Sequence, residues 1–394
     1  MIEIKSFNAK NGDSFYLYFP EEKFNLLIDG GYSDTYRNEI KLELEKIKAR
    51  GEKLDLLVIT HMDNDHINGI IKLIEDNGTN EESKIVKIEE IWFNSYFNSP
   101  TKKEQINLSA EMIKKLKVEI KTRDEDGYIG DIGVRELRKL TNLLKEGKYL
   151  VNTTFDSEAI YVENKNEVKK NKIVFKIISP REETLRELDI DFNKKINFLD
   201  DKKEFKYQEN LNDYFENFLD MMEHNFEDSE RGNISFEDDL NKLAELEDEE
   251  KNTLNNKASI AFVIEYNNKK LLFLGDASLN IYDEELKKNY LDIEEINFDF
   301  IKLSHHGSKY NISSAFINKV KCSNYFISTD GSGNHEHPHR ETIAKLIINS
   351  NQNINILLNT ENNSHYRWLN NLSTNVALKE RYGYKIEICS FIKI

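Results

Sequence analysis

The chain has 394 residues, 39% of them hydrophobic and 11% aromatic, which permits a sizeable buried core and excludes a chain that is disordered throughout. The formal net charge is −16, but residues 201–250 alone hold 18 acidic and 5 basic side chains, so the acidity describes one segment and not the whole surface. Only two cysteines occur, Cys322 and Cys389, and no continuous apolar run reaches about 18 residues. We therefore expect a cytoplasmic protein with neither a signal peptide nor a membrane span.

The first third of the chain predicts a β-rich start followed by alternating helices and strands. The expected strands are short apolar runs, at residues 15–19, 25–31, 54–60 and 88–93. The expected helices are amphipathic, at residues 39–49, 65–75, 106–116 and 133–144. The strand at 54–60 is apolar on both faces, so we expect it to be buried within a sheet.

The middle of the chain interrupts this alternation. A strand at residues 172–179 ends at Pro180, and residues 181–255 are polar, acidic and without strand signals. We expect a mainly helical acidic insertion there, within a single domain that spans residues 1–394. Its most acidic part, residues 201–250, is either a solvated charged surface, which is the simpler interpretation, or a docking site for a basic partner.

Regular α/β organisation resumes after residue 255. Residues 258–266 and 269–275 predict a hairpin around Asn267-Asn268. The remaining expected elements are strands at residues 300–304, 325–328, 354–359 and within 384–394, and a helix at 341–349.

Three of the predicted strands end directly in residues whose side chains bind metals. Those residues are His61, Asp63, Asp65 and His66 after the first strand, Asp276 after the second, and His305 and His306 after the third. A buried strand fixes the residue at its carboxyl end, so ligands placed there are held around a common edge. Imidazole and carboxylate together suit zinc, manganese or iron, and they leave positions open for water.

Each segment alone has a simpler explanation. A histidine at the end of a strand is usually a hydrogen-bonded polar residue, and Gly275-Asp276 alone is typical of a turn. Four candidate ligands within residues 61–66 are harder to explain, because packing them into a core without a metal leaves buried charge unpaired. The combination therefore predicts a metal centre.

The same residues resemble a known family. His61-x-Asp63-x-Asp65-His66 resembles the His-x-His-x-Asp-His signature of the metallo-β-lactamase superfamily, and residues 274–276 and 304–308 resemble its bridging-aspartate and late histidine motifs. One branch, the hydrolase domain of ComEC-type competence proteins, is similar at further motifs. Those motifs are Asn11-Gly12-Asp13-Ser14, Ile28-Asp29-Gly30-Gly31, Asn256-x-x-Ser259, Gly275-Asp276-Ala277, His305-His306-Gly307-Ser308 and Asn334-His335-Glu336-His337-Pro338. The resemblance covers residues 1–95 and 255–345, and the membrane channel of the competence proteins has no counterpart.

The resemblance implies an α/β fold of four layers, an αββα sandwich, with two divalent metal ions at one edge of its two sheets. The ions would be zinc or manganese, with iron as a third candidate. By position, the resemblance implies that His61 binds one metal, that Asp65 and His66 bind the other, that Asp276 bridges them and that His305 completes the second site. A bridging water would lose a proton near neutral pH and attack the substrate, and Asp65 would count as a catalytic residue as well as a ligand.

Two features depart from the superfamily pattern. Asp63 stands where a second histidine is usual, and as a ligand its oxygen would shift the preference from zinc towards manganese or iron. The middle histidine of the superfamily has no counterpart, because the only histidine between His66 and Asp276 is His224, inside the acidic insertion. We therefore expect a first metal site that is weak, singly occupied or completed by substrate.

Residues near the late histidine motif are candidates for contact with substrate. His306 either orients its neighbour or binds phosphate, and Ser308 and Asn334 can donate hydrogen bonds to an anionic oxygen. His337 either protonates the leaving group or has a structural role in its loop. Lys309 is either a phosphate contact or a surface residue.

The predicted chemistry suits phosphodiesters, lactones, thioesters and amides, and the fold does not choose among them. The resemblance implies a phosphodiesterase or nuclease, with nucleic acid as substrate in a basic groove. One alternative is hydrolysis of a small phosphorylated or lipid-linked molecule. Another is a metal-bearing subunit of a bacterial defence complex that works mainly through a protein partner bound to residues 201–250. No membrane partner is expected.

Overall fold

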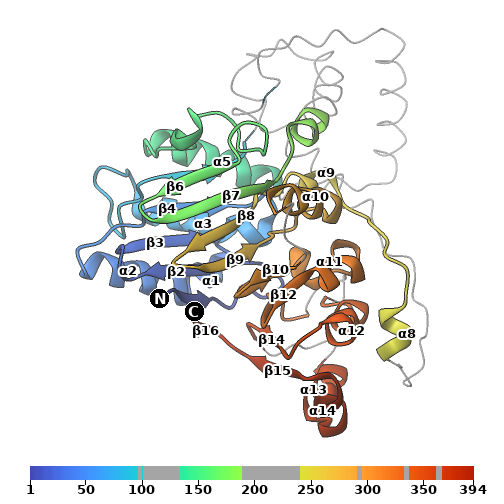
Figure 1. The fold of residues 1–394 in the computed structure, drawn as a ribbon. Coiled ribbons are helices and arrows are strands. Elements are labelled where there is room, and N and C mark those ends of the chain that lie inside the picture. Colours follow the sequence, from blue (N-terminus) through green and yellow to red (C-terminus); the bar gives the residue numbers. More distant parts are fainter. Residues whose placement is uncertain (96–99, 101–132, 189–239, 291–294, 332–336, 361–365) are drawn as a thin grey trace, which may run out of the picture.

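The computed structural model describes all residues except 96–99, 101–132, 189–239, 291–294, 332–336 and 361–365. Two β-sheets pack face to face, and helices cover their outer faces (Figure 1). The layers are therefore helix, sheet, sheet and helix. The predicted α/β class and αββα arrangement are confirmed.

The first sheet comes from the N-terminal part of the chain and from its last strand. In spatial order its strands are β16 (Phe391–Lys393), β1 (Glu3–Ser6), β2 (Phe15–Phe19), β3 (Phe24–Ile28), β4 (Leu56–Ile59) and β5 (Ile91–Phe93). β3, β4 and β5 run parallel, and the other neighbours are antiparallel. The helices of this half are α1 (Ser33–Thr35), the π-helix η1 (Tyr36–Ile40), α2 (Lys41–Ala49), α3 (Asn64–Asn77) and α5 (Gly133–Glu146).

The second sheet is larger. In spatial order its strands are β15 (Tyr384–Ile388), β14 (Ile354–Leu358), β13 (Asn324–Ile327), β11 (Phe300–Lys302), β9 (Lys269–Phe273), β8 (Ala261–Tyr266), β7 (Ile173–Ser179) and β6 (Glu167–Lys170). Its helices are α8 (Leu240–Ala244), α9 (Leu254–Lys257), α10 (Leu279–Asn289), α11 (Ser314–Lys319), α12 (Arg340–Asn349), α13 (Tyr366–Thr374) and α14 (Val376–Tyr382). A separate parallel pair consists of β10 (Ile296–Phe298) and β12 (Val320–Cys322). Short 3-10 helices are η3 (Thr153–Phe155), η5 (Ser304–Gly307) and η6 (Lys309–Asn311).

Apolar side chains fill the space between the sheets. All four residues of β4 are buried, as predicted for a strand that is apolar on both faces. Phe15 of β2 packs edge to face against Phe273 of β9 and Phe326 of β13, with ring centroids 5.7 and 5.2 Å apart. Such close packing holds the sheets rigidly together, so side chains at the end of β4 keep a defined position relative to those after β9 and β11.

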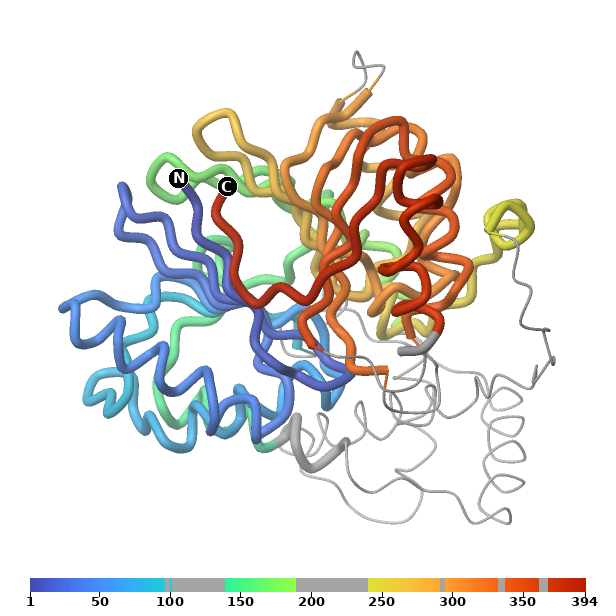
Figure 2. The backbone as a smooth tube through the Cα atoms, turned by 90° about the horizontal axis from the view of Figure 1, so that it is seen from below, coloured from blue at the N-terminus to red at the C-terminus, as the bar shows by residue number. Residues whose placement is uncertain are grey.

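Most predicted elements are confirmed, with ends shifted by a few residues. The hairpin of β8 and β9 turns at Asn267 and Asn268, whose φ angles of 46° and 62° are those a tight two-residue turn requires. The last predicted segment forms two strands in different sheets. β15 lies at the edge of the second sheet and β16 pairs with β1 of the first, so the two ends of the chain lie side by side (Figure 2).

Most of the predicted acidic insertion, including His224, lies outside the described residues, as does the predicted helix at 106–116. The described parts at its two ends contain helices, at residues 182–188 and in α8 and α9, but residues 245–253 between α8 and α9 are in no helix. Leu240 and Leu243 of α8 belong to the core on the outer face of the second sheet. Within the described ranges, no helix is both long enough and apolar enough to cross a membrane.

Candidate metal centre

The carboxyl ends of three strands meet at one edge of the two sheets. β4 leads to His61, β9 to Asp276 and β11 to His305. β9 and β11 are parallel neighbours, so their ends lie side by side in the second sheet. β4 belongs to the first sheet, and the amide of Ile260 donates a hydrogen bond of 2.8 Å to the carbonyl of Thr60 between the sheets. Both sheets therefore build the edge that the sequence predicts.

The first ligand segment uses the start of a helix. Asp63 is the N-cap residue of α3 and has an extended backbone, and Asp65 and His66 lie in its first turn. A carboxylate is favourable there because the helix N-terminus carries partial positive charge. The neighbouring loop presses against this turn at Gly12, where an added Cβ would lie 2.0 Å from the carbonyl oxygen of Asp65. The approach therefore requires glycine at position 12.

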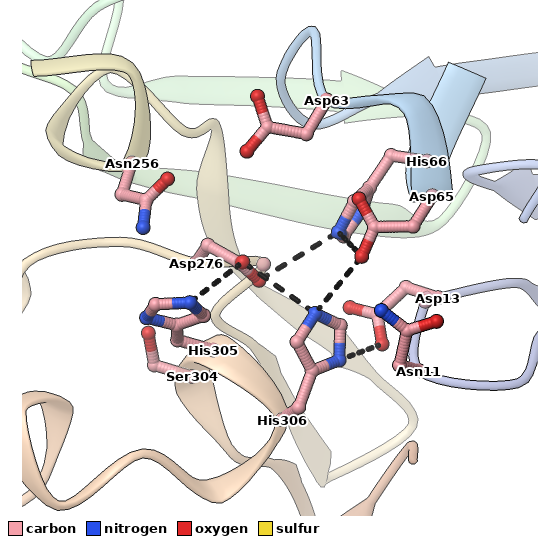
Figure 3. Close-up of polar contacts among 12 residues, drawn as sticks. Asn11, Asp13, Asp63, Asp65, His66, Asn256, Asp276, Ser304, His305 and His306 are labelled. Carbon is pink, nitrogen blue, oxygen red and sulfur yellow. Dashed lines mark ion pairs between the residues drawn. The ribbon is translucent and has the colours of Figure 1, made fainter. Parts of the chain in front are cut away.

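The ligand segment after β11 has an irregular backbone. His305, His306 and Gly307 have φ angles of 47°, 53° and 84°, a region that costs a residue other than glycine about 1–2 kcal/mol. The turn is held by hydrogen bonds from His305 N to Gly275 O (2.9 Å) and from His339 N to Gly307 O (3.2 Å). As a result, two successive histidine side chains both point towards Asp276 (Figure 3).

The Nε2 atoms of four histidines converge on the carboxylate of Asp276. Oδ2 lies 3.7 Å from His61, 3.8 Å from His305 and 3.6 Å from His306, and Oδ1 lies 3.9 Å from His66. Two ligands that bind one zinc ion tetrahedrally at 2.0–2.2 Å stand about 3.5 Å apart. The observed spacing is therefore close to that of ligands sharing metal ions.

Two further carboxylates lie beside three of these histidines. Asp65 Oδ2 lies 3.8 Å from His66 Nε2 and 3.6 Å from His306 Nε2. Asp63 Oδ2 lies 3.1 Å from His61 Nε2. Around Asp276, the ligand atoms of Asp65, His66 and His306 lie within 4.8 Å of one another, as do those of His61, His66 and Asp276. Asp63 contacts His61, and His305 contacts Asp276.

The Nδ1 atom of each of the four histidines has an oxygen partner. Those partners are Thr60 Oγ1 for His61 (3.0 Å), Asp29 Oδ2 for His66 (2.9 Å), Asn311 Oδ1 for His305 (3.2 Å) and the carbonyl of Ser328 for His306 (2.8 Å). The Thr60 hydroxyl donates to Asp29 (2.7 Å), so it can accept from His61. With the proton on Nδ1, each ring presents the lone pair of Nε2 to the centre, as metal-binding histidines do.

Two of the candidate ligands have a buried polar atom without a hydrogen-bond partner among the described residues. They are Nε2 of His66 and Oδ1 of Asp276. An unpaired buried polar atom costs about 1–3 kcal/mol, and a metal ion would supply the missing interaction. Nitrogen and carboxylate ligands together suit zinc, manganese and iron. The residues present therefore fit divalent metal ions.

The histidines and carboxylates of the centre shift one another's pKa values. Burial alone would lower the pKa of His61, but Asp63 and Asp276 raise that pKa to about 10. Burial would also lower the pKa of His306, but Asp276 and Asp13 raise it to about 9. Conversely, burial would raise the pKa of Asp276, but the histidines around it hold that pKa well below its usual value. Metal binding must therefore displace protons from these imidazoles.

Aromatic rings lead outward from the centre. The ring centroid of His337 lies 5.0 Å from that of His305 and 4.9 Å from that of His339, and His339 lies 5.9 Å from Tyr310. Ser308 is 1% exposed, and its hydroxyl accepts a hydrogen bond from the amide of Tyr310. In this position Ser308 stabilises the loop, whereas we expected it to contact substrate. Asn334 lies outside the described residues.

The structure brings all six predicted ligands together and changes the expected roles of the two late histidines. We expected His305 to join Asp65 and His66, and His306 to orient it or to bind substrate. Instead, Nε2 of His306 lies beside Asp65, and Nε2 of His305 lies beside Asp276. The left-handed backbone causes this arrangement, and nothing in the local sequence indicates it.

Several supporting residues were not assigned a role from sequence. They are Asp13, Asp29, Asn255, Lys302 and Asn311, of which Asn255 donates a hydrogen bond to Asp63 Oδ1. Asp13 and Asp29 lie in motifs that resemble the competence-protein branch, and that resemblance was the available signal. Asn255, Lys302 and Asn311 carried no signal of their own, because their roles depend on contacts between distant segments.

Comparison with known proteins agrees with this fold. Residues 9–139 match the family model of the Metallo-beta-lactamase superfamily, a stretch that contains His61, Asp63, Asp65 and His66. No curated protein sequence gives a significant match to the chain.

Similar solved structures are distant. The metallo-beta-lactamase fold protein YhfI from Bacillus subtilis and Zn(2+)-bound PqqB from Methylobacterium extorquens each have 10% identity and a TM-score of 0.37, with both chains covered fully. CmlA, a diiron beta-hydroxylase from Streptomyces venezuelae, has 9% identity and a TM-score of 0.38, and the match covers all of this chain but 54% of CmlA. At these scores, none of the three indicates an activity for this chain.

Proposed function

Because residues 9–139 carry a metallo-β-lactamase superfamily domain, and members of that superfamily are generally metal-dependent hydrolases, we propose that this chain is a metal-dependent phosphodiesterase that cleaves nucleic acid. The observation that carries the hydrolase proposal is the convergence of four histidine Nε2 atoms on Asp276. Zinc or manganese ions bound there would lower the pKa of a water molecule and stabilise negative charge on the substrate.

Under this proposal, each of two ions has its own set of residues. Asp65, His66 and His306 would hold one ion, Asp63, His61 and His305 would hold the other, and Asp276 would lie between them. His305 would then replace the histidine that is missing between His66 and Asp276. The first site would be complete without a ligand from the substrate.

We assign two side chains a direct role on the substrate. His337 is 8% exposed, and its ring lies against that of His305. From there it could give a proton to the oxygen of the leaving group. Figure 3 shows the side chain of Asn256 facing Asp276 and His305. Its amide could donate a hydrogen bond to an oxygen of the substrate.

The substrate class rests on the rings outside the centre and on the resemblance to a domain that degrades DNA. The row His305, His337, His339 and Tyr310 ends between two lysines, since the Nζ atoms of Lys251 and Lys309 lie 4.9 and 5.3 Å from the ring centroid of Tyr310. Aromatic side chains that can stack on bases, together with cations near the backbone, are typical of proteins that bind single strands.

The test combines elemental analysis with cleavage assays on single-stranded DNA, double-stranded DNA and bis-p-nitrophenyl phosphate, each with zinc or manganese. Wild type should bind metal and cleave at least one DNA substrate, and Asp276→Ala should lose both properties. Glu90→Gln is a suitable control, because Glu90 is also a buried carboxylate but precedes β5 at the opposite end of the sheet from His61. Absence of metal from wild type, even after reconstitution, would contradict the proposal.

Metal binding without cleavage of any of the three substrates would instead favour a small phosphorylated or lipid-linked substrate, or a protein partner. Deleting residues 201–239 tests the second alternative and spares Leu240 and Leu243, which belong to the core. Cleavage that rises after deletion would indicate that the segment covers the centre. Loss of a binding partner at unchanged activity would indicate docking.

A further inference from the structure

Lys302 is a charged side chain in the interior of the protein. It lies at the end of β11, three residues before His305, and its side chain is 1% exposed. Its ammonium group forms an ion pair with Asp13 and donates a hydrogen bond of 3.0 Å to the carbonyl of Gly275. Burial at this level excludes contact between Lys302 and a substrate, so its role must be exerted on its protein neighbours.

A second carboxylate is within reach of the same ammonium. Oδ1 of Asp276 lies 3.9 Å from Lys302 Nζ. This is the oxygen of Asp276 that has no hydrogen-bond partner among the described residues. Lys302 therefore lies within ion-pair distance of both carboxylates, and Asp13 is the closer partner.

Asp13 is held in place independently of Lys302. Its amide donates to the carbonyl of Asp65 (3.3 Å), and its carbonyl accepts from the amide of Gly31 (2.9 Å). The Asp13 side chain is therefore presented to Lys302 by the first half of the protein, whereas Lys302 and Asp276 belong to the second half.

The charges at the centre are balanced when this pair is included. Five carboxylates lie at or next to the histidines, those of Asp13, Asp29, Asp63, Asp65 and Asp276. Two divalent ions and one ammonium group carry the same total charge with opposite sign. If Asp13 were neutral, the ammonium would be left unpaired, and the nearest available carboxylate would be that of Asp276.

We propose that Asp13 is a positioning residue that holds the ammonium of Lys302 away from Asp276, so that the Asp276 carboxylate stays available to the metal ions. The proposal rests on the metal centre described above. The proposal predicts that replacing Asp13 weakens metal binding, and that replacing Lys302 as well restores it.

The experiment measures the affinity of the folded apoprotein for zinc alone, by competition with a chromophoric chelator. Asp13→Asn should bind zinc about 10–100-fold more weakly than wild type, the range found when a residue behind a metal ligand is lost. The double variant Asp13→Asn/Lys302→Met should recover most of that loss. Lys302→Met alone should bind zinc at least as tightly as wild type, and Glu90→Gln should bind it equally.

Circular dichroism and thermal unfolding without metal establish that each variant is folded. Wild-type affinity in Asp13→Asn, or a double variant as weak as Asp13→Asn, would overturn the proposal, since a merely structural role predicts that both variants are impaired. If Asp13→Asn does not fold, Lys302→Met decides, because weaker zinc binding than wild type would overturn the proposal. Failure of wild type to bind zinc or manganese would instead contradict the metal centre itself, and metal binding without hydrolysis would contradict only the proposed activity.

Discussion

The two halves of the metal centre are built in different ways. In the first half, the end of β4 and the first turn of α3 hold His61, Asp65 and His66 through regular backbone geometry. In the second half, a left-handed turn directs His305 and His306 to one carboxylate. The comparison teaches that a ligand's direction follows from its place in the chain only where the backbone is regular.

The largest expected effect comes from removing one ligand from each half. His66→Ala and His305→Ala should each lose one of two metal ions and slow cleavage by about 10²–10³-fold, as when one electrostatic stabiliser is lost. Elemental analysis after dialysis and initial rates of cleavage would measure these changes. Loss of both ions from each single variant would contradict the proposed assignment of His66 and His305 to different ions.

A smaller effect should follow from removing the hydrogen bond that orients the ring of His305 in the second half of the centre. Asn311→Leu removes the oxygen that holds Nδ1 of His305 at 3.2 Å, so the affinity for the ion on that side should fall about 10–100-fold. Asn311→Asp keeps an oxygen in the same place and should bind zinc more tightly than Asn311→Leu. Equal zinc affinities of the two variants in a chelator competition would show that this contact does not orient the ring.

The left-handed turn itself can be tested with a matched pair of glycines. Gly307 and Gly51 have φ angles of 84° and 70°, but a Cβ at Gly307 would lie 2.9 Å from the Cβ of Pro338, whereas a Cβ at Gly51 meets nothing within 4 Å. Substitution by alanine should lower the free energy of unfolding by about 1–2 kcal/mol at either position. Gly307→Ala alone should also weaken zinc binding. Unchanged zinc affinity in that variant would show that the ligands do not depend on the turn.

The smallest effect on the metal centre is expected for a carboxylate that is remote from both halves. Glu90 accepts hydrogen bonds from Thr154 and pairs with Lys170. Burial would raise the pKa of Glu90, but these partners lower it below the ordinary value of 4.5. Its contribution to stability is therefore complete above pH 4.5 and disappears as the pH falls through the lowered folded-state value.

Glu90→Gln should therefore be less stable than wild type by about 1–3 kcal/mol at neutral pH, with the difference shrinking in acid. Urea unfolding at about pH 7 and about pH 3 would measure this difference, and a constant difference would contradict the assignment. Metal affinity should be unchanged, which separates general stability from the integrity of the centre.

Much of the fold could be predicted because its signals are local. The apolar runs predict the strands β2, β4 and β9, and the spacing of apolar residues predicts α3. Metal-binding residue types at the ends of three strands indicated one shared edge of the two sheets. The exchanged positions of His305 and His306 could not be predicted, because they depend on three backbone angles. The buried position of Lys302 could not be predicted either, because it depends on Asp13, nearly 300 residues earlier in the chain.

The pairing of β16 with β1 has a consequence for the synthesis of the protein. Ile2 and Ile394 exchange backbone hydrogen bonds of 2.7 and 2.9 Å, although almost the whole chain separates them. At usual rates of translation, β16 is therefore synthesised tens of seconds after β1. During that time one edge of the first sheet is free to pair with another nascent chain. The residues between must emerge in full before that edge is protected, so a premature stop would leave behind a chain prone to aggregate.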